Sequence, residues 1–209
     1  MTDPLDPQLM LEITRRAKVQ LRRRLKDLRG SYPRAALARR SELIKDRLLE
    51  LPELAQARSV ALFYPLIDRG EVDLRTLDEE LRRRGALVYY PFMRPNAGGG
   101  FVTGFGLSAD LAELDERGRG FPEPPPDAHV ALPGELDLVV VPALAADGSG
   151  YRLGYGSGFY DATLTDVAPP ALTVVVVFDF QLLAEIPSEA HDVRCNIVLT
   201  DARIVRPTP

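Results

Sequence analysis

The residues best suited to chemistry lie in residues 151–161, whose sequence is YRLGYGSGFYD. Gly154, Gly156 and Gly158 stand at alternate positions. Because glycine has no Cβ, the backbone there can approach a ligand closely and adopt positive φ, and successive N–H groups can converge on an anion. Arg152 can add a fixed positive charge and a bidentate fork of donors. The stretch predicts a phosphate-binding loop, although a tight turn accounts for the glycines equally well.

The segment before this loop is typical of a strand buried on both faces. Residues 138–141 are apolar and mostly β-branched, which favours such a strand. Pro142 and a polar turn at residues 147–150 follow before the glycines. A buried strand that delivers a glycine-rich loop at its carboxyl end is where an open α/β sheet binds phosphorylated ligands. The G-x-x-x-x-G-K-[ST] and G-x-G-x-x-G spacings are both absent, so neither common nucleotide fingerprint applies.

A strongly basic helix is predicted near the amino terminus. Apolar residues recur at three- and four-residue steps over residues 8–28, and Gly30 should end the helix. Between Arg15 and Arg29 there are eight Lys or Arg residues and one acid. Lys18 and Arg22 are four apart and project from one face. By itself, this pattern favours a solvated basic face over a binding site.

The remaining elements predict an α/β protein. We expect one domain over residues 1–209, with a three-layer α/β/α architecture, a mostly parallel, doubly wound, Rossmann-like sheet and an amino-terminal helical hairpin within residues 1–55. The expected helices are 33–51, ended by Pro52, and 74–84, and the expected strands are 59–65, 86–91, 138–141, a central strand at 172–180 and a final strand after residue 192. Residues 116–135 are rich in Pro and Gly and lack helical or strand periodicity, and a loop of this length in a compact domain is usually either functional or disordered.

Composition restricts the class of protein. The 209 residues are 45% hydrophobic and 27% charged, with a net charge of -4, which argues against a nucleic-acid binder. No stretch reaches the ~20 apolar residues of a membrane span, and residues 1–10 lack the features of an export signal. The single cysteine, Cys195, cannot form an intramolecular disulfide and should pack in the core. These observations favour a cytoplasmic protein with no membrane partner.

Several motifs together resemble one family. The string at residues 151–161 resembles the signature of the 5-formyltetrahydrofolate cyclo-ligases, also called methenyltetrahydrofolate synthetases. KVQLR at 18–22, YPLIDRGEVD at 64–73, GFPEP at 120–124 and HD at 191–192 are similar to other family elements, in the expected order. The resemblance implies ATP-dependent conversion of 5-formyltetrahydrofolate to 5,10-methenyltetrahydrofolate, with release of ADP and phosphate. The formyl oxygen is first phosphorylated, and the ring then closes.

The resemblance also implies roles for individual residues. Arg152 and Lys18 are the expected catalytic residues. The expected ATP-binding residues are Lys18, Arg22, Arg152, Leu153, Gly154, Tyr155, Gly156, Ser157, Gly158, Phe159 and Tyr160. The expected folate-binding residues are Tyr64, Glu71, Tyr155, Gly156, Ser157, Gly158 and Phe159, with Phe121 as a further aromatic contact. Some relatives carry lysine or another cation where Ser157 and Tyr155 stand here, which makes the rate harder to predict.

Asp161 and Asp192 are the Mg²⁺ ligands that the resemblance implies, and Mg²⁺ prefers carboxylate, phosphate and water oxygens. Without the resemblance, Asp161 would be a helix N-cap candidate and Asp192 an ordinary loop acid. Glu71 alone would be taken to stabilise a helix macrodipole. His191 would be taken as a hydrogen-bonded structural residue, since no triad pattern surrounds it.

Two other classes of function stay open on the sequence. A similar parallel sheet also carries sugar-phosphate isomerases and CoA-transferase-like enzymes, and a shared fold does not carry function. A non-catalytic relative that binds folate or nucleotide is the second alternative. The expected partners are a reduced folate and ATP, with no nucleic acid, and the expected assembly is a monomer or a weak homodimer.

Overall fold

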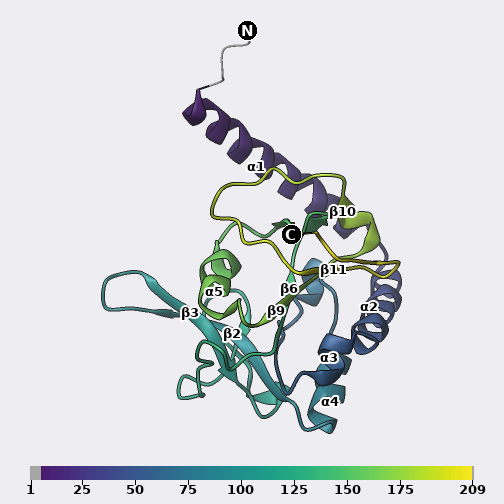
Figure 1. Cartoon of the computed structure of the whole chain (residues 1–209), viewed down its shortest axis with the longest axis vertical. Coiled ribbons are helices and arrows are strands. Elements are labelled where there is room, and N and C mark those ends of the chain that lie inside the picture. Colours follow the sequence, from purple (N-terminus) through teal and green to yellow (C-terminus); the bar gives the residue numbers. More distant parts are fainter. Residues whose placement is uncertain (1–5, 209) are drawn as a thin grey trace.

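Seven strands form one sheet in the order β12-β11-β9-β6-β1-β2-β3 in the computed structural model (Figure 1). The structure describes residues 6–208. Residues 1–5 and 209 lie outside it, so half of the segment that was expected to lack an export signal, residues 1–10, lies outside the described residues. The strands are β1 (Ser59–Ala61), β2 (Leu87–Pro95), β3 (Phe101–Leu107), β6 (Leu138–Pro142), β9 (Leu172–Val176), β11 (Ile197–Leu199) and β12 (Ile204–Val205).

The sheet is doubly wound, as the sequence predicts. Strands β2, β1, β6, β9 and β11 run parallel, and β3 and β12 add antiparallel edges. The chain passes from β1 to β2 and β3 on one side, then returns to build β6, β9 and β11 on the other. The direction of winding therefore changes between β1 and β6. Ligands of such sheets bind beyond the carboxyl ends of the strands at this switch point.

Helices cover both faces and so complete the three layers. The helices are α1 (Pro7–Ser31), α2 (Arg34–Leu49), α3 (Pro52–Gln56), α4 (Arg75–Arg83) and α5 (Phe159–Val167). Helices α2, α3 and α4 pack on one face in a cluster that includes Val140. Helix α5 packs on the other face with Val139 and Val141. All three valines of β6 are fully buried, which confirms the strand buried on both faces.

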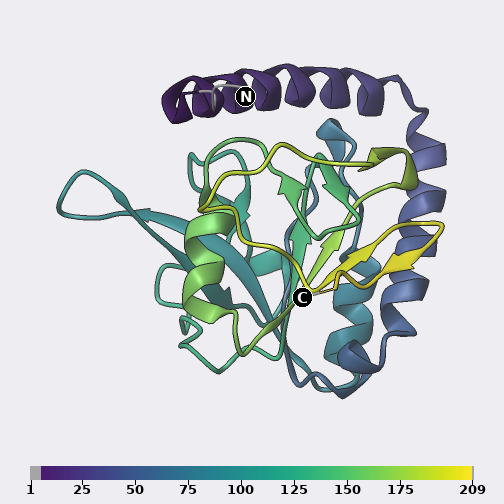
Figure 2. The same ribbon diagram turned by 45° about the horizontal axis from the view of Figure 1, so that its top comes forward.

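Helix α1 lies across the carboxyl ends of the strands, and α2 runs down one side of the sheet (Figure 2). The two amino-terminal helices diverge at a corner because Pro33 is extended, with ψ 135°. Leu25 is buried, whereas Met10 and Ile13, which the sequence placed on the same apolar stripe, are exposed. Pro52 also differs from expectation, since it begins α3 instead of only ending α2.

Several segments differ from their predicted forms. The glycine-rich loop does not come directly from β6, because β7 (Ala145–Asp147) and β8 (Arg152–Leu153) intervene as a hairpin, paired with β10 (Leu182–Leu183) in a second sheet. The predicted strand 59–65 keeps ladder pairing only through Ala61, and strand 172–180 only through Val176. The Pro/Gly-rich segment overlaps a short hairpin of β4 (Asp115–Glu116) and β5 (Pro122–Glu123). None of the helices within residues 6–208 combines the length and the hydrophobicity that a membrane-spanning helix needs.

Candidate active site

A cavity of about 620 Å³ lies beyond the carboxyl ends of β1 and β6. Helix α1, the segment after β1, the Pro/Gly-rich segment and the glycine loop (residues 154–158) line it. Every residue that the sequence analysis proposed for ATP, folate or Mg²⁺ lines this one cavity, and Phe121 and His191 do so too. The fold therefore brings together candidates that are more than 170 residues apart in sequence, such as Lys18 and Asp192.

The glycine loop owes its shape to two residues with positive φ. Gly156 has φ 107° and Gly158 has φ 71°, which L-residues rarely adopt. Gly158 is the N-cap of α5, so Asp161 lies in the first turn and is not the N-cap. The Arg22 side chain fixes the start of the loop, because its Nε donates to the Gly154 carbonyl oxygen at 2.9 Å.

Replacing Gly156 by alanine should distort the loop. A Cβ there has room, since its nearest neighbour is the Arg22 guanidinium at 3.6 Å, but the backbone would be strained at φ 107°. Such strain costs about 2 kcal/mol, so we expect a lower melting temperature and a KM for ATP raised about 10-fold. Gly148→Ala is the matched control, because Gly148 has no positive φ and nothing within 4 Å of an added Cβ. An unchanged KM for ATP in Gly156→Ala would contradict the prediction that this loop binds the phosphates of ATP.

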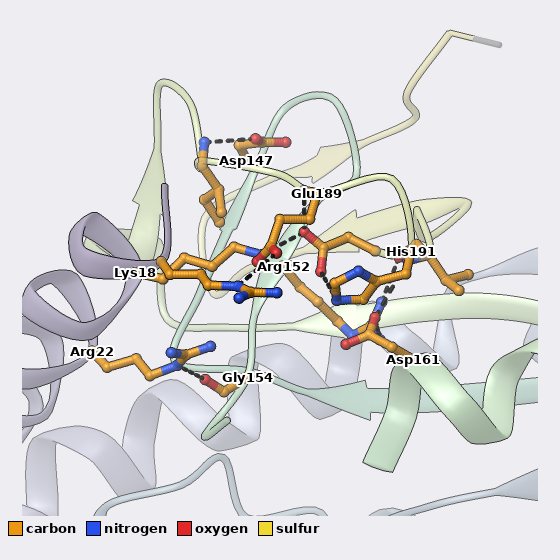
Figure 3. Close-up of polar contacts among 12 residues, drawn as sticks. Lys18, Arg22, Asp147, Arg152, Gly154, Asp161, Glu189 and His191 are labelled. Carbon is orange, nitrogen blue, oxygen red and sulfur yellow. Dashed lines mark hydrogen bonds and ion pairs between the residues drawn. The ribbon is translucent and has the colours of Figure 1, made fainter. Parts of the chain in front are cut away.

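Lys18 is buried and bound to two carboxylates. It is 5% exposed, and its Nζ lies 2.6 Å from Asp192 Oδ2 and 3.0 Å from Glu189 Oε1 (Figure 3). The hydrogen bond from Lys18 is the main reason that the pKa of Glu189 is lowered. For Lys18 the solvated-face interpretation is wrong, because the helix lies against the loops beyond the sheet and this side chain points into them.

Arg152 is held at the cavity wall by two acceptors. One terminal nitrogen donates to Asp161 Oδ1 at 2.6 Å (Figure 3). The other donates to the Val193 carbonyl oxygen. The Val193 N–H also donates to Asp161 Oδ1, at 3.3 Å. The Arg152 side chain is 4% exposed. Its position is therefore fixed by α5 and by the segment that carries Asp192.

The two candidate metal ligands both line the cavity, but each is paired with a cation. Asp161 binds Arg152 and Asp192 binds Lys18. Among residues 6–208, no group of three or more His, Cys, Asp or Glu side chains is arranged to hold a metal ion. The donor set fits Mg²⁺ only if phosphate and water oxygens complete its shell. The assignment of Asp161 and Asp192 to Mg²⁺ stays a prediction.

A second wall of the cavity combines a buried acid with phenols. Glu71 is 8% exposed, and its Oε2 accepts a hydrogen bond from the Leu66 N–H at 2.9 Å. It precedes α4 by four residues, so the macrodipole interpretation is wrong. Burial, followed by the charge of Glu71, raises the pKa of Tyr155 and Tyr160, so both phenols are neutral at physiological pH. The Arg29 guanidinium donates to the Tyr155 hydroxyl.

Comparison with known proteins identifies the family. Residues 14–201 match the model of the 5-formyltetrahydrofolate cyclo-ligase family. This chain belongs to that family. A 5-formyltetrahydrofolate cyclo-ligase from Mycolicibacterium smegmatis is 37% identical over 197 residues, which cover 90% of this chain and 95% of that protein. One from Escherichia coli K12 is 33% identical over 160 residues, which cover 76% and 86%.

A solved cyclo-ligase relative shares the fold. The NMR structure of Aquifex aeolicus 5,10-methenyltetrahydrofolate synthetase has a TM-score of 0.79 and 29% sequence identity, and the match covers 92% of this chain and 93% of that one. The expected family, fold class and enzyme class, a ligase, are therefore confirmed. Membership of the cyclo-ligase family also decides against the sugar-phosphate isomerases and CoA-transferase-like enzymes that fold analogy allowed.

Sequence analysis missed four charged residues in the cyclo-ligase cavity, which are Arg15, Arg69, Arg119 and Glu189. Arg15 lies on α1, one turn before Lys18. The other three lie in segments without helical or strand periodicity, so only their neighbouring motifs, YPLIDRGE, GFPEP and HD, could have indicated them. His191 also differs from expectation. Its side chain is 68% exposed, and its Nε2 lies 3.8 Å from Asp192 Oδ1, which is too far for a hydrogen bond.

The cyclo-ligase core meets the expectation for Cys195, whereas the folate contact expected of Phe121 stays a prediction. Phe121 packs edge-on to Phe159, with 6.1 Å between ring centroids. Cys195 is buried in the core, and burial raises the pKa of its thiol. The Tyr155 ring is surrounded by the cations of Lys26, Arg29 and Arg69, each within 5.7 Å of the ring centroid. Positive charge is therefore present where some relatives carry a cationic side chain in place of this tyrosine.

Proposed function

We propose that this chain converts 5-formyltetrahydrofolate and ATP to 5,10-methenyltetrahydrofolate, ADP and phosphate in this cavity. The observation that carries the proposal is the cavity itself, in a chain that matches the cyclo-ligase family over residues 14–201. One wall supplies cations and a glycine loop suited to a triphosphate. The other supplies a buried carboxylate and aromatic rings suited to a reduced folate.

The reaction needs activation of a weak electrophile. A formyl amide carbon is poorly reactive and its oxygen is a poor leaving group, so the formyl oxygen first attacks the γ-phosphorus of ATP and ADP leaves. The folate nitrogen N10 then attacks the formyl carbon, the C–O bond breaks, phosphate departs and N10 loses its proton. Phosphoryl transfer of this kind is accelerated mainly by positioning and charge neutralisation.

Lys18, Arg22 and Arg152 are the residues that we assign to the triphosphate. Lys18 uses two of its three N–H donors on Glu189 and Asp192, so a third can bind a phosphate oxygen. The Arg152 fork can neutralise charge that builds up on the transferred phosphoryl group. The N–H groups of the glycine loop add neutral donors beside these cations.

Asp161 and Asp192 are the residues that we assign to Mg²⁺, with phosphate and water oxygens completing its shell. When bound, Mg²⁺ supplies further neutralisation of phosphate charge. Both aspartates line the cavity next to the two cations assigned to phosphates, which supports the assignment.

Glu71 and Tyr64 are the residues that we assign to the pterin end of the folate. One oxygen of Glu71 is engaged by the Leu66 N–H, and the other can accept from the amino and N–H donors of a pterin ring. We also propose that the chain acts as a single domain, as a monomer or weak homodimer, in the cytoplasm, without nucleic-acid or membrane partners.

The test is a spectrophotometric assay of the purified protein with 5-formyltetrahydrofolate, ATP and Mg²⁺. The methenyl product absorbs near the ultraviolet-visible boundary, so we expect its chromophore to appear only with the complete mixture. Omission of either substrate, or chelation of Mg²⁺ by excess EDTA, should abolish the signal. A protein that is stabilised thermally by Mg-ATP and folate yet forms no product would be the non-catalytic relative, and the proposal would fail.

A further inference from the structure

Two arginines that line the cavity are not paired with a carboxylate. Arg69 ends the 3₁₀ helix η1 (Ile67–Arg69), and Arg119 lies between β4 and β5. Within residues 6–208, neither side chain forms an ion pair or donates a hydrogen bond, whereas Lys18 and Arg152 in the same cavity are both paired. An arginine fork with free donors beside a substrate cavity is suited to a carboxylate or a phosphate.

The Arg69 side chain lies close to the turn that carries Arg119. The Arg69 guanidinium lies over the Tyr155 ring, 5.7 Å from its centroid, and one of its nitrogens comes within 3.6 Å of where a Cβ on Gly120 would lie. The Arg119 guanidinium lies over the Phe101 ring at 4.5 Å. These cation–π contacts orient the guanidinium groups and leave N–H edges free for an anion.

The turn that carries Arg119 is fixed as well. Glu116 Oε1 accepts hydrogen bonds from the Arg119 N–H at 2.7 Å and from the Gly120 N–H at 3.0 Å. The Glu116 carboxylate is therefore bound by backbone N–H groups of the turn. A fixed turn places the Arg119 side chain at the cavity without the ordering cost that a flexible loop would incur on binding.

The cavity contains a group suited to each part of the proposed substrate, with the acid buried and an arginine exposed. Glu71 is 8% exposed, whereas Arg69, two residues earlier, is exposed. The rings of Phe121 and Phe159 form an aromatic part of the wall of the same cavity. A reduced folate has hydrogen-bond donors on its pterin ring, an aromatic aminobenzoyl group in the middle and a glutamate with two carboxylates at the far end.

We propose that Arg69 and Arg119 form a carboxylate clamp that binds the glutamate end of the folate. The inference rests on the proposed function, because it assigns the tail of that substrate to the mouth of the same site. The clamp selects substrates that carry a terminal dicarboxylate, and Arg69 and Arg119 act in binding and not in phosphoryl transfer. ATP is held elsewhere in the cavity, by the residues of α1 and the glycine loop.

The experiment compares two substrates across four proteins. The substrates are 5-formyltetrahydropteroylglutamate and 5-formyltetrahydropteroate, which lacks the glutamate. The proteins are the wild type, Arg69→Gln, Arg119→Gln and the double variant. For partly exposed charge pairs we expect KM for the glutamate substrate to rise about 5-fold in each single variant and about 20-fold in the double variant. KM for the pteroate and KM for ATP should change less than about 2-fold.

Ionic strength gives a second readout. Because exposed charge pairs are screened by salt, KM of the wild type for the glutamate substrate should rise between 0.05 and 0.5 M salt, by about 5-fold. The double variant should show little salt dependence. Arg117→Gln is the matched control, since Arg117 is exposed on the same turn but does not line the cavity, and it should match the wild type.

Each outcome separates the clamp from the proposed function. A wild type that turns over neither substrate overturns the proposed function and the clamp with it. An active wild type whose preference for the glutamate substrate survives in the double variant overturns the clamp alone. A rise in KM for ATP, with KM for the folate unchanged, would assign the two arginines to the nucleotide and would also overturn the clamp.

Discussion

Replacing Arg152 by alanine should lower kcat for methenyl formation by about 10³-fold, because the variant loses the fixed charge assigned to the transferred phosphoryl group. The side chain is 4% exposed and bound to Asp161 and Val193. Its removal leaves a partly buried carboxylate unpaired, which should cost about 2 kcal/mol and lower Tm by about 6 °C. Steady-state kinetics below the unfolding transition separates the two effects.

Two further variants test whether Arg152 acts on phosphate or only supports the fold. Arg152→Lys keeps a charge but not the planar fork, so we expect kcat to fall about 10²-fold with a smaller loss of stability. Asp161→Asn keeps an oxygen acceptor near Arg152 but loses a negative charge. It should sharply weaken activity and raise the Mg²⁺ concentration needed for half-maximal rate. If all three variants lose activity only in proportion to their unfolded fraction, Arg152 has a structural role alone.

Replacing Lys18 by methionine should raise KM for ATP about 100-fold. The variant loses a buried cation that has a spare donor for phosphate. It leaves Asp192 without its lysine partner, and Glu189 with Arg15 as its remaining ion-pair partner. Arg16→Met is the matched control on the same helix. The Arg16 side chain is 76% exposed, its only ion pair among residues 6–208 is with Glu12, and it is not among the residues that line the cavity. Arg16→Met should change KM for ATP less than 2-fold. Equal effects of the two substitutions would contradict a specific role for Lys18.

The ion pair between Lys18 and Glu189 should also make the stability of the fold decrease at low pH. Hydrogen bonding to Lys18 lowers the pKa of Glu189 in the folded state below 4.5, its ordinary value. The stability that this ion pair contributes is therefore fully present above pH 4.5, and it is lost as the pH falls through the lower pKa of Glu189 in the folded state. In Lys18→Met this contribution is absent. Thermal melts should show the wild type more stable than the variant at pH 7, with the difference narrowing as the pH falls below 4.5.

Much of the fold was predictable because it depends on local patterns. The β-branched run of β6 predicts a strand buried on both faces, and the three- and four-residue periodicity predicts α1. Boundaries were less predictable. Side chains of residues after Ala61 are still apolar and buried, but their backbone leaves the ladder as the chain turns toward the cavity. The β7–β8 hairpin was missed because each of its strands has only two or three residues.

The sequence by itself determined which residue types were available for phosphate and folate chemistry, since the glycine loop, the basic helix and the acidic motifs are each local strings. Only the tertiary structure decided which charges are paired. Lys18 meets Glu189 and Asp192 across more than 170 residues, whereas Arg69 and Arg119 reach the same cavity without an acidic partner among the described residues. The physical reason is that ion pairing depends on distances of a few ångströms, which are set by how loops from separate strands converge beyond the sheet and not by spacing along the chain.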